Sequence, residues 1–310
     1  MTKLGTSDLD VSRLCLGGNV FGWTADEESS FAVLDAYARA GGNFVDTADA
    51  YSAWTEGHVG GESETVIGKW LRSRGNRDSI VVATKVGMLR GLADLKAATI
   101  ERAAEDSLRR LGVDHIDLYY AHQDDLGTPQ EETLAAFDRL VRAGKVRHVA
   151  ASNYTAERLT SALAVAEREG FAKFVALQQA YNLVDRSYEG ELSRAVADHG
   201  LVSAPYWGLA KGFLTGKYRP GVTVESARAA AASKYLNERG LRILAALDEV
   251  AGSHHTTQAA VALAWLAVQP TVASPIASAR TTDQLADLLP ALELELKPDE
   301  VAALTAASSI

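Results

Sequence analysis

Short apolar runs rich in β-branched residues recur along the chain, and each is followed by a stretch with helical periodicity. The runs are nearly continuous in hydrophobicity, which is typical of parallel strands covered on both faces. The stretches between them place apolar side chains at three- and four-residue steps, as Ile100, Ala104 and Leu108 do, which predicts amphipathic helices. Eight strands are predicted, starting near Leu14, Asn43, Ile80, Ile116, Arg147, Phe174, Leu201 and Val272.

A strand and a helix, repeated eight times, favour a single (β/α)8 TIM barrel of the α/β class over an open doubly wound sheet. Roughly 30 residues separate most strand starts, as a βα unit requires, but the last interval runs from Leu201 to Val272. We therefore predict a long loop after strand seven, an additional helix around 223–235 and extra helices at the carboxyl end. No composition shift or Pro/Ser-rich linker divides the chain, so residues 1–310 are predicted to form one domain.

Composition narrows the function classes. The 310 residues are 47% hydrophobic and 23% charged, as in ordinary globular proteins. The 31 basic and 40 acidic residues give a net charge of −9, which disfavours a nucleic-acid binder. A single cysteine, Cys15, excludes an intrachain disulfide framework and a Cys-rich metal site, and we predict no metal site. Without a signal-peptide core or the roughly 18 apolar residues of a membrane span, we expect a cytoplasmic protein.

Polar residues close three of the apolar runs. In a barrel the active site lies at the carboxyl ends of the strands, and Asp46, Lys85 and His122 end predicted strands two, three and four. Asp46 is the natural counter-ion of Lys85, because burial opposes an unpaired charge. Tyr51 follows in the loop after strand two, and a cation such as Lys85 lowers the pKa of a neighbouring phenol. With His122 orienting a carbonyl or sharing the proton, the set suits protonation of an oxygen that gains negative charge, as a carbonyl does on accepting hydride.

Several long segments carry ordered motifs. They are LGTSDLDVSRLCLGGNVFGW (4–23), NFVDTADAYSAW (43–54), GESETVIGKWL (61–71), VVATKVG (81–87), DLYYAHQDD (117–125), GKVRHVAASNY (144–154), LQQAYNLVDR (177–186) and PYWGLAKGFLTGKY (205–218). In these segments the chain resembles the aldo-keto reductase superfamily over nearly its whole length. The branch that it resembles includes bacterial aryl-alcohol-dehydrogenase-like reductases and is similar to potassium-channel β subunits.

The resemblance implies a catalytic tetrad of Asp46, Tyr51, Lys85 and His122, the four residues that the strand ends also select. It further implies a nicotinamide cofactor, usually NADPH, with NADH as the alternative, held without a Rossmann domain. Ser152, Asn153 and Gln178 are implied to bond the carboxamide and Tyr206 to stack on the ring. The other implied cofactor contacts are Leu209, Lys211, Gly212 and Leu214 over the pyrophosphate, and Ser278, Ala279, Arg280 and Gln284 near the adenosine and its 2′-phosphate.

Two further groups of residues bear on specificity. Trp23, Trp54, Met88 and Trp207 fall on carboxyl-end loops and are predicted to line an aromatic or apolar substrate pocket. The chain also departs from the branch that it resembles: Trp207-Gly208 stands where Ser-Pro is usual, Ser278 replaces a glycine, and Leu288 replaces an asparagine that often contacts adenine. The first two changes reshape loops, and the third removes a hydrogen bond to adenine.

The predicted function is NADPH-dependent reduction of an aldehyde or ketone to the alcohol, with Tyr51 as the general acid. The similarity to channel β subunits permits a second function, a cofactor-sensing binding subunit with little turnover. A third is a Schiff-base aldolase that uses Lys85. The expected partner is a small-molecule carbonyl compound, with neither nucleic acid nor a membrane, and the oligomeric state is left open.

Overall fold

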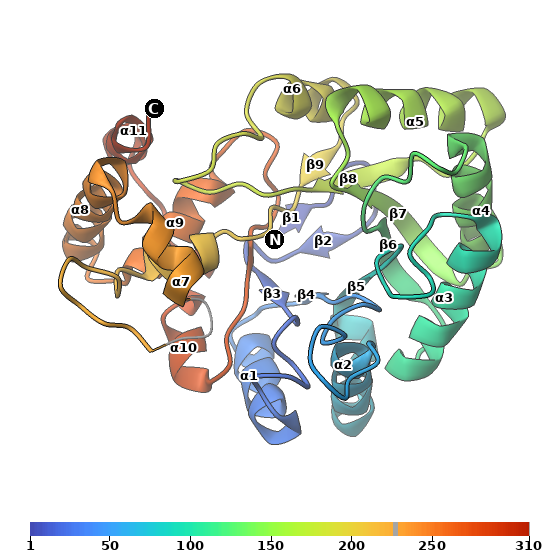
Figure 1. Cartoon of the computed structure of the whole chain (residues 1–310), viewed down its shortest axis with the longest axis horizontal. Coiled ribbons are helices and arrows are strands. Elements are labelled where there is room, and N and C mark those ends of the chain that lie inside the picture. Colours follow the sequence, from blue (N-terminus) through green and yellow to red (C-terminus); the bar gives the residue numbers. More distant parts are fainter. Residues whose placement is uncertain (226–228, 310) are drawn as a thin grey trace.

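The barrel strands follow the predicted order. The computed structural model describes residues 1–225 and 229–309 and contains a parallel sheet in the order β10-β3-β4-β5-β6-β7-β8-β9 (Figure 1). Its strands are β3 (Cys15–Gly17), β4 (Phe44–Asp46), β5 (Val81–Val86), β6 (Ile116–Ala121), β7 (Val146–Ser152), β8 (Phe174–Gln178), β9 (Val202–Ser203) and β10 (Ile276–Ala277). The first seven begin within one residue of their predicted starts, which confirms the (β/α)8 fold.

The eighth strand is interrupted, and both of its halves take part in closing the barrel. The prediction that it starts near Val272 is wrong, because regular pairing begins only at Ile276. Val272 forms an isolated bridge with Ser203 of β9, and the two residues beside Val272 exchange hydrogen bonds with Ser203 (2.6 and 2.9 Å). Pro275 then interrupts the ladder because it has no N–H to donate. Beyond Pro275 the chain pairs with β3.

Helices surround the strands, as Figure 1 shows. The described helices between the strands are α1 (Glu27–Arg39), α2 (Glu62–Arg74), η1 (Arg77–Ser79), α3 (Ala97–Leu111), α4 (Gln130–Arg142), α5 (Ala156–Glu169) and α6 (Glu191–Asp198), followed after β9 by η2 (Ala210–Thr215), α7 (Ala229–Ala232), η3 (Ser233–Tyr235), α8 (Glu238–Ser253) and α9 (Gln258–Ala267). Of the helix predicted around 223–235, residues 226–228 lie outside the described residues. The predicted extra helices after β10 are α10 (Thr282–Ala286), η4 (Leu289–Leu292) and α11 (Pro298–Ala307). In the described parts of the chain, none of the helices combines the length and apolarity that a membrane span requires.

A short hairpin that the sequence did not predict covers the amino-terminal end of the barrel. It consists of β1 (Thr2–Lys3) and β2 (Asp10–Val11), which lie over the centre of the strands in Figure 1. Leu4, Leu9 and Val11 are buried in the same apolar cluster as the inward-facing strand residues. The hairpin covers the amino-terminal end of the barrel. The opposite end, where the loops follow the carboxyl ends of the strands, is the mouth at which the predicted site lies.

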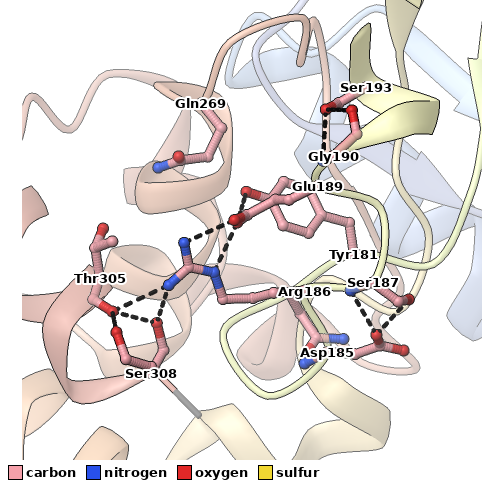
Figure 2. A network of polar contacts seen from close by, with 12 residues as sticks. Tyr181, Asp185, Arg186, Ser187, Glu189, Gly190, Ser193, Gln269, Thr305 and Ser308 are labelled. Carbon is pink, nitrogen blue, oxygen red and sulfur yellow. Dashed lines mark hydrogen bonds and ion pairs between the residues drawn. The ribbon is translucent and has the colours of Figure 1, made fainter. Parts of the chain in front are cut away.

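Helix α11 is clamped to the loop that follows β8. Figure 2 shows Arg186 between this loop and the helix end: its Nη1 donates to the carbonyl of Thr305 (3.0 Å) and to Ser308 Oγ (3.1 Å). Its Nε and Nη2 donate to the carboxylate of Glu189 (2.7 and 2.8 Å), which also accepts the hydroxyl of Tyr181 (2.7 Å). A cation at a helix carboxyl end complements the helix dipole. The clamp therefore stabilises the loop against the carboxyl-terminal helices.

Candidate active site

The alternation of side chains along the strands decides which residues reach the mouth of the barrel. Phe44, Ala83 and Tyr120 are fully buried in the cluster inside the barrel. Because successive side chains of a strand point to opposite faces, the residue two positions further along also faces inward. The inward residues at the carboxyl ends are Asp46, Lys85, His122, Ser152 and Gln178. The alternate strand residues Val45, Val82 and Ala121 pack outward, in the apolar cluster that includes the helices.

Lys85 is at the centre of the polar contacts at this mouth. It is fully buried, and its Nζ donates to Asp46 Oδ2 (2.7 Å), the carbonyl oxygen of Thr47 (2.7 Å) and Tyr51 Oη (2.9 Å). Tyr51 Oη also donates to Asp46 Oδ2 (3.2 Å). Lys85 and Asp46 form the ion pair expected from the sequence, and Tyr51 is bonded to both partners. Since the ion pair is removed from water, its attraction is weakly screened.

The expectation that Lys85 lowers the pKa of Tyr51 is wrong for this structure. Burial and the negative charge of Asp46 raise the pKa of Tyr51 well above its usual value, because both disfavour the phenolate. Tyr51 therefore keeps its proton at neutral pH. With Lys85 donating to its oxygen, it can give that proton to a much stronger base, such as an oxygen that has just gained negative charge.

His122 follows β6 and lies beside Tyr51, with the ring centroids 6.1 Å apart and the planes at 71°. Burial and the nearby charge of Lys85 hold the pKa of His122 well below its usual value. Within the described residues its Nδ1 has no hydrogen-bond partner. A neutral imidazole can donate one hydrogen bond and accept another, so His122 suits orienting a carbonyl better than supplying a proton.

Gln178 joins the predicted cofactor residues to the predicted tetrad. Its Nε2 donates to Asp46 Oδ1 (2.8 Å), although the two residues are 132 positions apart in the sequence. Sequence reasoning missed this contact and the acceptance of a Lys85 hydrogen bond by the carbonyl of Thr47. A backbone carbonyl is present at every residue, so no residue type could have indicated the second contact.

Asn153 links three of the other predicted positions. Its Nδ2 donates to the carbonyl of His122 (2.9 Å) and to Ser152 Oγ (3.1 Å), and its Oδ1 accepts the hydroxyl of Tyr206 (2.8 Å). Asn153 adopts a left-handed backbone conformation (φ 58°), which asparagine tolerates better than most residues. The hydrogen bonds therefore bring Ser152, Asn153 and Tyr206 to the same end of the barrel as His122.

The loop after β9 is held in an uncommon conformation. Trp207, Lys211 and Gly212 have positive φ angles of 56°, 59° and 95°. The side chain of Leu214 is buried in the core, and Leu209 packs partly against that core, so these two leucines offer a ligand mainly their backbone. The ammonium of Lys211 lies 4.3 Å from the centroid of the Trp207 ring.

The predicted adenosine residues follow β10. Ser278 Oγ donates to Asn19 Oδ1 (2.6 Å), and Ala279 is fully buried. The backbone N–H of Arg280 donates to Gln284 Oε1 (3.0 Å). The side chain of Gln284, on α10, thus bonds the backbone just before this helix. In residues 1–225 and 229–309, the guanidinium of Arg280 takes part in no ion pair. Of the groups predicted here, this guanidinium is the clearest candidate for an anionic ligand.

Aromatic residues stand on two sides of these groups. Trp23 and Trp54 pack edge to face (5.3 Å, 85°), and Trp54 also contacts the ring of Tyr51 (6.2 Å). Trp207 is 47% exposed and packs against Tyr206 (5.1 Å), separately from this pair. Met88, 46% exposed, lies in the loop after β5. The structure thus brings Trp54 to Tyr51, with Trp23 packed on Trp54, and brings Trp207 to the predicted ring-stacking residue Tyr206.

Comparisons with known proteins match this architecture. Residues 13–309 match the model of the Aldo/keto reductase family. Similar proteins include the "Uncharacterized oxidoreductase YrpG" of Bacillus subtilis, 36% identical over 95% of this chain and 91% of its own length. The "Norsolorinic acid reductase stcV" of Emericella nidulans is 33% identical over 94% of this chain and 76% of its own length. A "Probable voltage-gated potassium channel subunit beta" of Oryza sativa subsp. japonica is 32% identical over 94% and 90%.

Proposed function

The chain belongs to the aldo/keto reductase family and is an NAD(P)H-dependent oxidoreductase, and from this premise we propose that it reduces an aldehyde or ketone to the alcohol with NADPH and Tyr51 as the general acid. The observation that carries the proposal is the contact of Tyr51 Oη with the buried Lys85 Nζ (2.9 Å), which is itself paired with Asp46 (2.7 Å). A phenol held by a buried cation at the mouth of a barrel is arranged to deliver a proton.

Each of the four polar residues has one role in the proposed reaction. A bound nicotinamide supplies the hydride to the carbonyl carbon. Tyr51 donates its proton to the substrate oxygen, and the Lys85 ammonium stabilises the negative charge left on the Tyr51 oxygen until a proton from water replaces the one transferred. Asp46 stabilises the charge of Lys85 inside the barrel. Neutral His122 bonds the carbonyl and turns it toward Tyr51.

The residues present fit a dinucleotide phosphate. In a chain of net charge −9, most basic side chains are expected to find acidic partners, yet no ion pair of Lys211 or Arg280 occurs among the described residues. Both lie on loops at the carboxyl ends of neighbouring parts of the barrel, after β9 and β10. Lys211 would face the pyrophosphate and Arg280 the 2′-phosphate, with the carboxamide held by Ser152, Asn153 and Gln178. The other side chains of these loops would shape the site: Tyr206, Leu209, Gly212, Leu214, Ser278, Ala279 and Gln284.

The proposed function is tested by incubating the protein with NADPH and a panel of aldehydes and ketones. We expect NADPH oxidation that depends on the carbonyl compound, with one alcohol formed for each NADPH consumed. Negligible turnover on the whole panel, together with a partner protein recovered in a pull-down, would favour the binding-subunit function that the similarity to a channel β subunit suggests. The aldolase function is disfavoured, because an amine that donates three hydrogen bonds offers no lone pair to a carbonyl.

Replacement of Arg280 by alanine is expected to raise the KM for NADPH by about 10- to 100-fold, as the loss of charge-assisted hydrogen bonds would. The KM for NADH should not change, because NADH lacks the 2′-phosphate. Steady-state kinetics with both cofactors measures the difference. Arg90→Ala, an exposed charge on the loop after β5, is the matched control for the net charge and should leave both values unchanged. An equal effect of Arg280→Ala on NADPH and NADH would contradict the role in 2′-phosphate binding.

The remaining sequence-based predictions concern the surroundings of the site. Trp23 and Trp54 are proposed to line an aromatic or apolar substrate pocket, because Trp54 packs beside Tyr51 and Trp23 packs on Trp54. Met88 and Trp207 are proposed to extend this lining where they are exposed. A cytoplasmic location and a small carbonyl compound as the main partner also stay predictions.

A further inference from the structure

Asp49 is a buried carboxyl group for which the proposed mechanism has no use. It lies in the turn between Asp46 and Tyr51 and is fully buried. Within the described part of the chain, neither of its carboxylate oxygens has a hydrogen-bond partner. An ionised carboxylate in such a place has lost its water without gaining donors, which is strongly unfavourable.

The cations near Asp49 are already paired with other acids. The carboxylate of Glu64, on α2 and fully buried, accepts the Nε of Arg110 from α3 (2.6 Å). Lys85 of β5 forms its ion pair with Asp46 (2.7 Å). Three buried acids therefore face two cations, and each cation lies in hydrogen-bonding contact with an acid other than Asp49. With one acid more than the number of cations, and both cations bonded to other acids, Asp49 is the carboxyl group that we expect to keep its proton.

The electrostatics of the surrounding elements point the same way. Burial and the charge of Glu64 raise the pKa of Asp49 to about 8, and the positive charges of Arg110 and Lys85 offset only part of this. Tyr119 of β6 lies close enough to interact with Asp49. Burial, and after it the negative charges of Asp49 and Glu64, raise the pKa of Tyr119. Tyr119 thus stays a neutral phenol and adds no negative charge beside Asp49.

We propose that Asp49 is a positioning residue for Tyr51, which holds the catalytic turn in place only while its carboxyl group is protonated. The backbone hydrogen bonds at the centre of the turn are long: the N–H of Asp49 donates to the carbonyl of Lys85 on β5 (3.3 Å), and within the turn the N–H of Tyr51 donates to the carbonyl of Ala48 (3.3 Å). Loss of the proton places an unpaired charge beside Glu64. The charge is relieved when the turn moves toward water, and this movement withdraws Tyr51 from Lys85.

This inference rests on the proposed role of Tyr51, and its test is the substitution Asp49→Asn, which keeps the shape and removes the titration. We expect wild-type kcat to be constant near pH 7 and to fall about tenfold per pH unit above about pH 8, as a single ionisation requires. Asp49→Asn should have a similar kcat at pH 7 and keep it to higher pH. Superimposable pH profiles for the two proteins would overturn the proposal.

Thermal unfolding supplies a second measurement that needs no catalysis. The unfolded acid loses its proton near pH 4 and the folded one near pH 8, so the wild type loses stability as the pH rises between these values and no further above them. Asn at position 49 has no such loss. The Tm of Asp49→Asn relative to the wild type should therefore increase from pH 5 to pH 8. A constant difference in Tm would contradict a neutral Asp49.

Asp117→Asn is the matched control. Asp117 is also buried (2% exposed), but it pairs with Arg77 (2.8 Å) and Arg147 (2.9 Å). The same substitution there should lower Tm at neutral pH and leave the alkaline limb of kcat as in the wild type. If Asp49→Asn fails to fold, infrared spectra of the wild type decide: a protonated-carboxyl band present at pH 7 and lost by pH 9 supports the proposal, and its absence at pH 7 overturns it. If Tyr51 proves not to be the acid, the Tm and infrared results still test Asp49 by themselves.

Discussion

Replacement of Tyr51 by phenylalanine is expected to lower kcat for carbonyl reduction by about 10²- to 10⁴-fold, the usual contribution of a positioned general acid. The substitution removes the proton that the reaction requires and the oxygen to which Lys85 donates (2.9 Å). The ring stays, so its contacts with Trp54 (6.2 Å) and with the Lys85 ammonium (4.7 Å) are retained. We therefore expect the KM for NADPH and the Tm to remain close to the wild-type values.

The measurement is steady-state kinetics with the best substrate of the aldehyde panel, together with thermal unfolding. Tyr120→Phe is the matched control, because Tyr120 lies inside the same barrel and its ring centroid is 5.8 Å from Lys85 Nζ. It removes a hydroxyl from the barrel interior without touching the contact between Tyr51 and Lys85, and it should keep most of the activity. Equal kcat values for Tyr51→Phe and the wild type would show that another group delivers the proton.

Replacement of Lys85 by methionine is expected to have the largest effect on stability as well as to abolish turnover. Methionine keeps most of the length of the side chain but leaves Asp46, 2% exposed, as a buried carboxylate without its cation. Removing one partner of a buried ion pair destabilises a protein by about 3–5 kcal/mol. Denaturant unfolding should show this loss as a lower midpoint with an unchanged slope.

A double variant separates charge from packing. In Asp46→Asn/Lys85→Met no uncompensated charge is buried, so part of the stability lost in the single variant should return, while turnover stays abolished. Gln178 Nε2 can still donate to the oxygen of the asparagine side chain, as it does to Asp46 (2.8 Å). If the double variant is less stable than Lys85→Met, the ion pair is not the source of the effect.

The barrel strands were predictable because each is long enough, or buried enough, to appear in the sequence as a run of apolar residues. Ile116–Ala121 is apolar or aromatic except for Asp117, Phe174–Gln178 is apolar up to its last residue, and the starts of both strands agree with the prediction. The hairpin of Thr2–Lys3 and Asp10–Val11 could not be predicted in this way, because strands of two residues are too short to show an apolar run or an alternation of apolar and polar residues. The eighth strand was misplaced because Val272 and Ile276 are both apolar, whereas the pairing is decided by Pro275 and by the partners on either side.

The predicted site shows a similar division. Asp46, Lys85 and His122 could be selected from their places at strand ends, and the structure brings them to one mouth of the barrel with Tyr51. The direction of the Tyr51 pKa shift was wrong, because the expectation counted the cation alone. Burial and the second contact with Asp46 outweigh it, and both depend on the folded surroundings.

Residue types and their order were sufficient for the barrel, the family and the four polar residues at its mouth, because periodicity, strand ends and motifs are local properties of the chain. Only the folded chain decides which charges are paired. Asp46 and Asp49 are three residues apart and both buried, yet Asp46 contacts Lys85, whereas neither carboxylate oxygen of Asp49 has a hydrogen-bond partner in residues 1–225 and 229–309. The physical reason is that a charge inside a protein is governed by distances to groups from other strands and helices, and these distances exist only after folding.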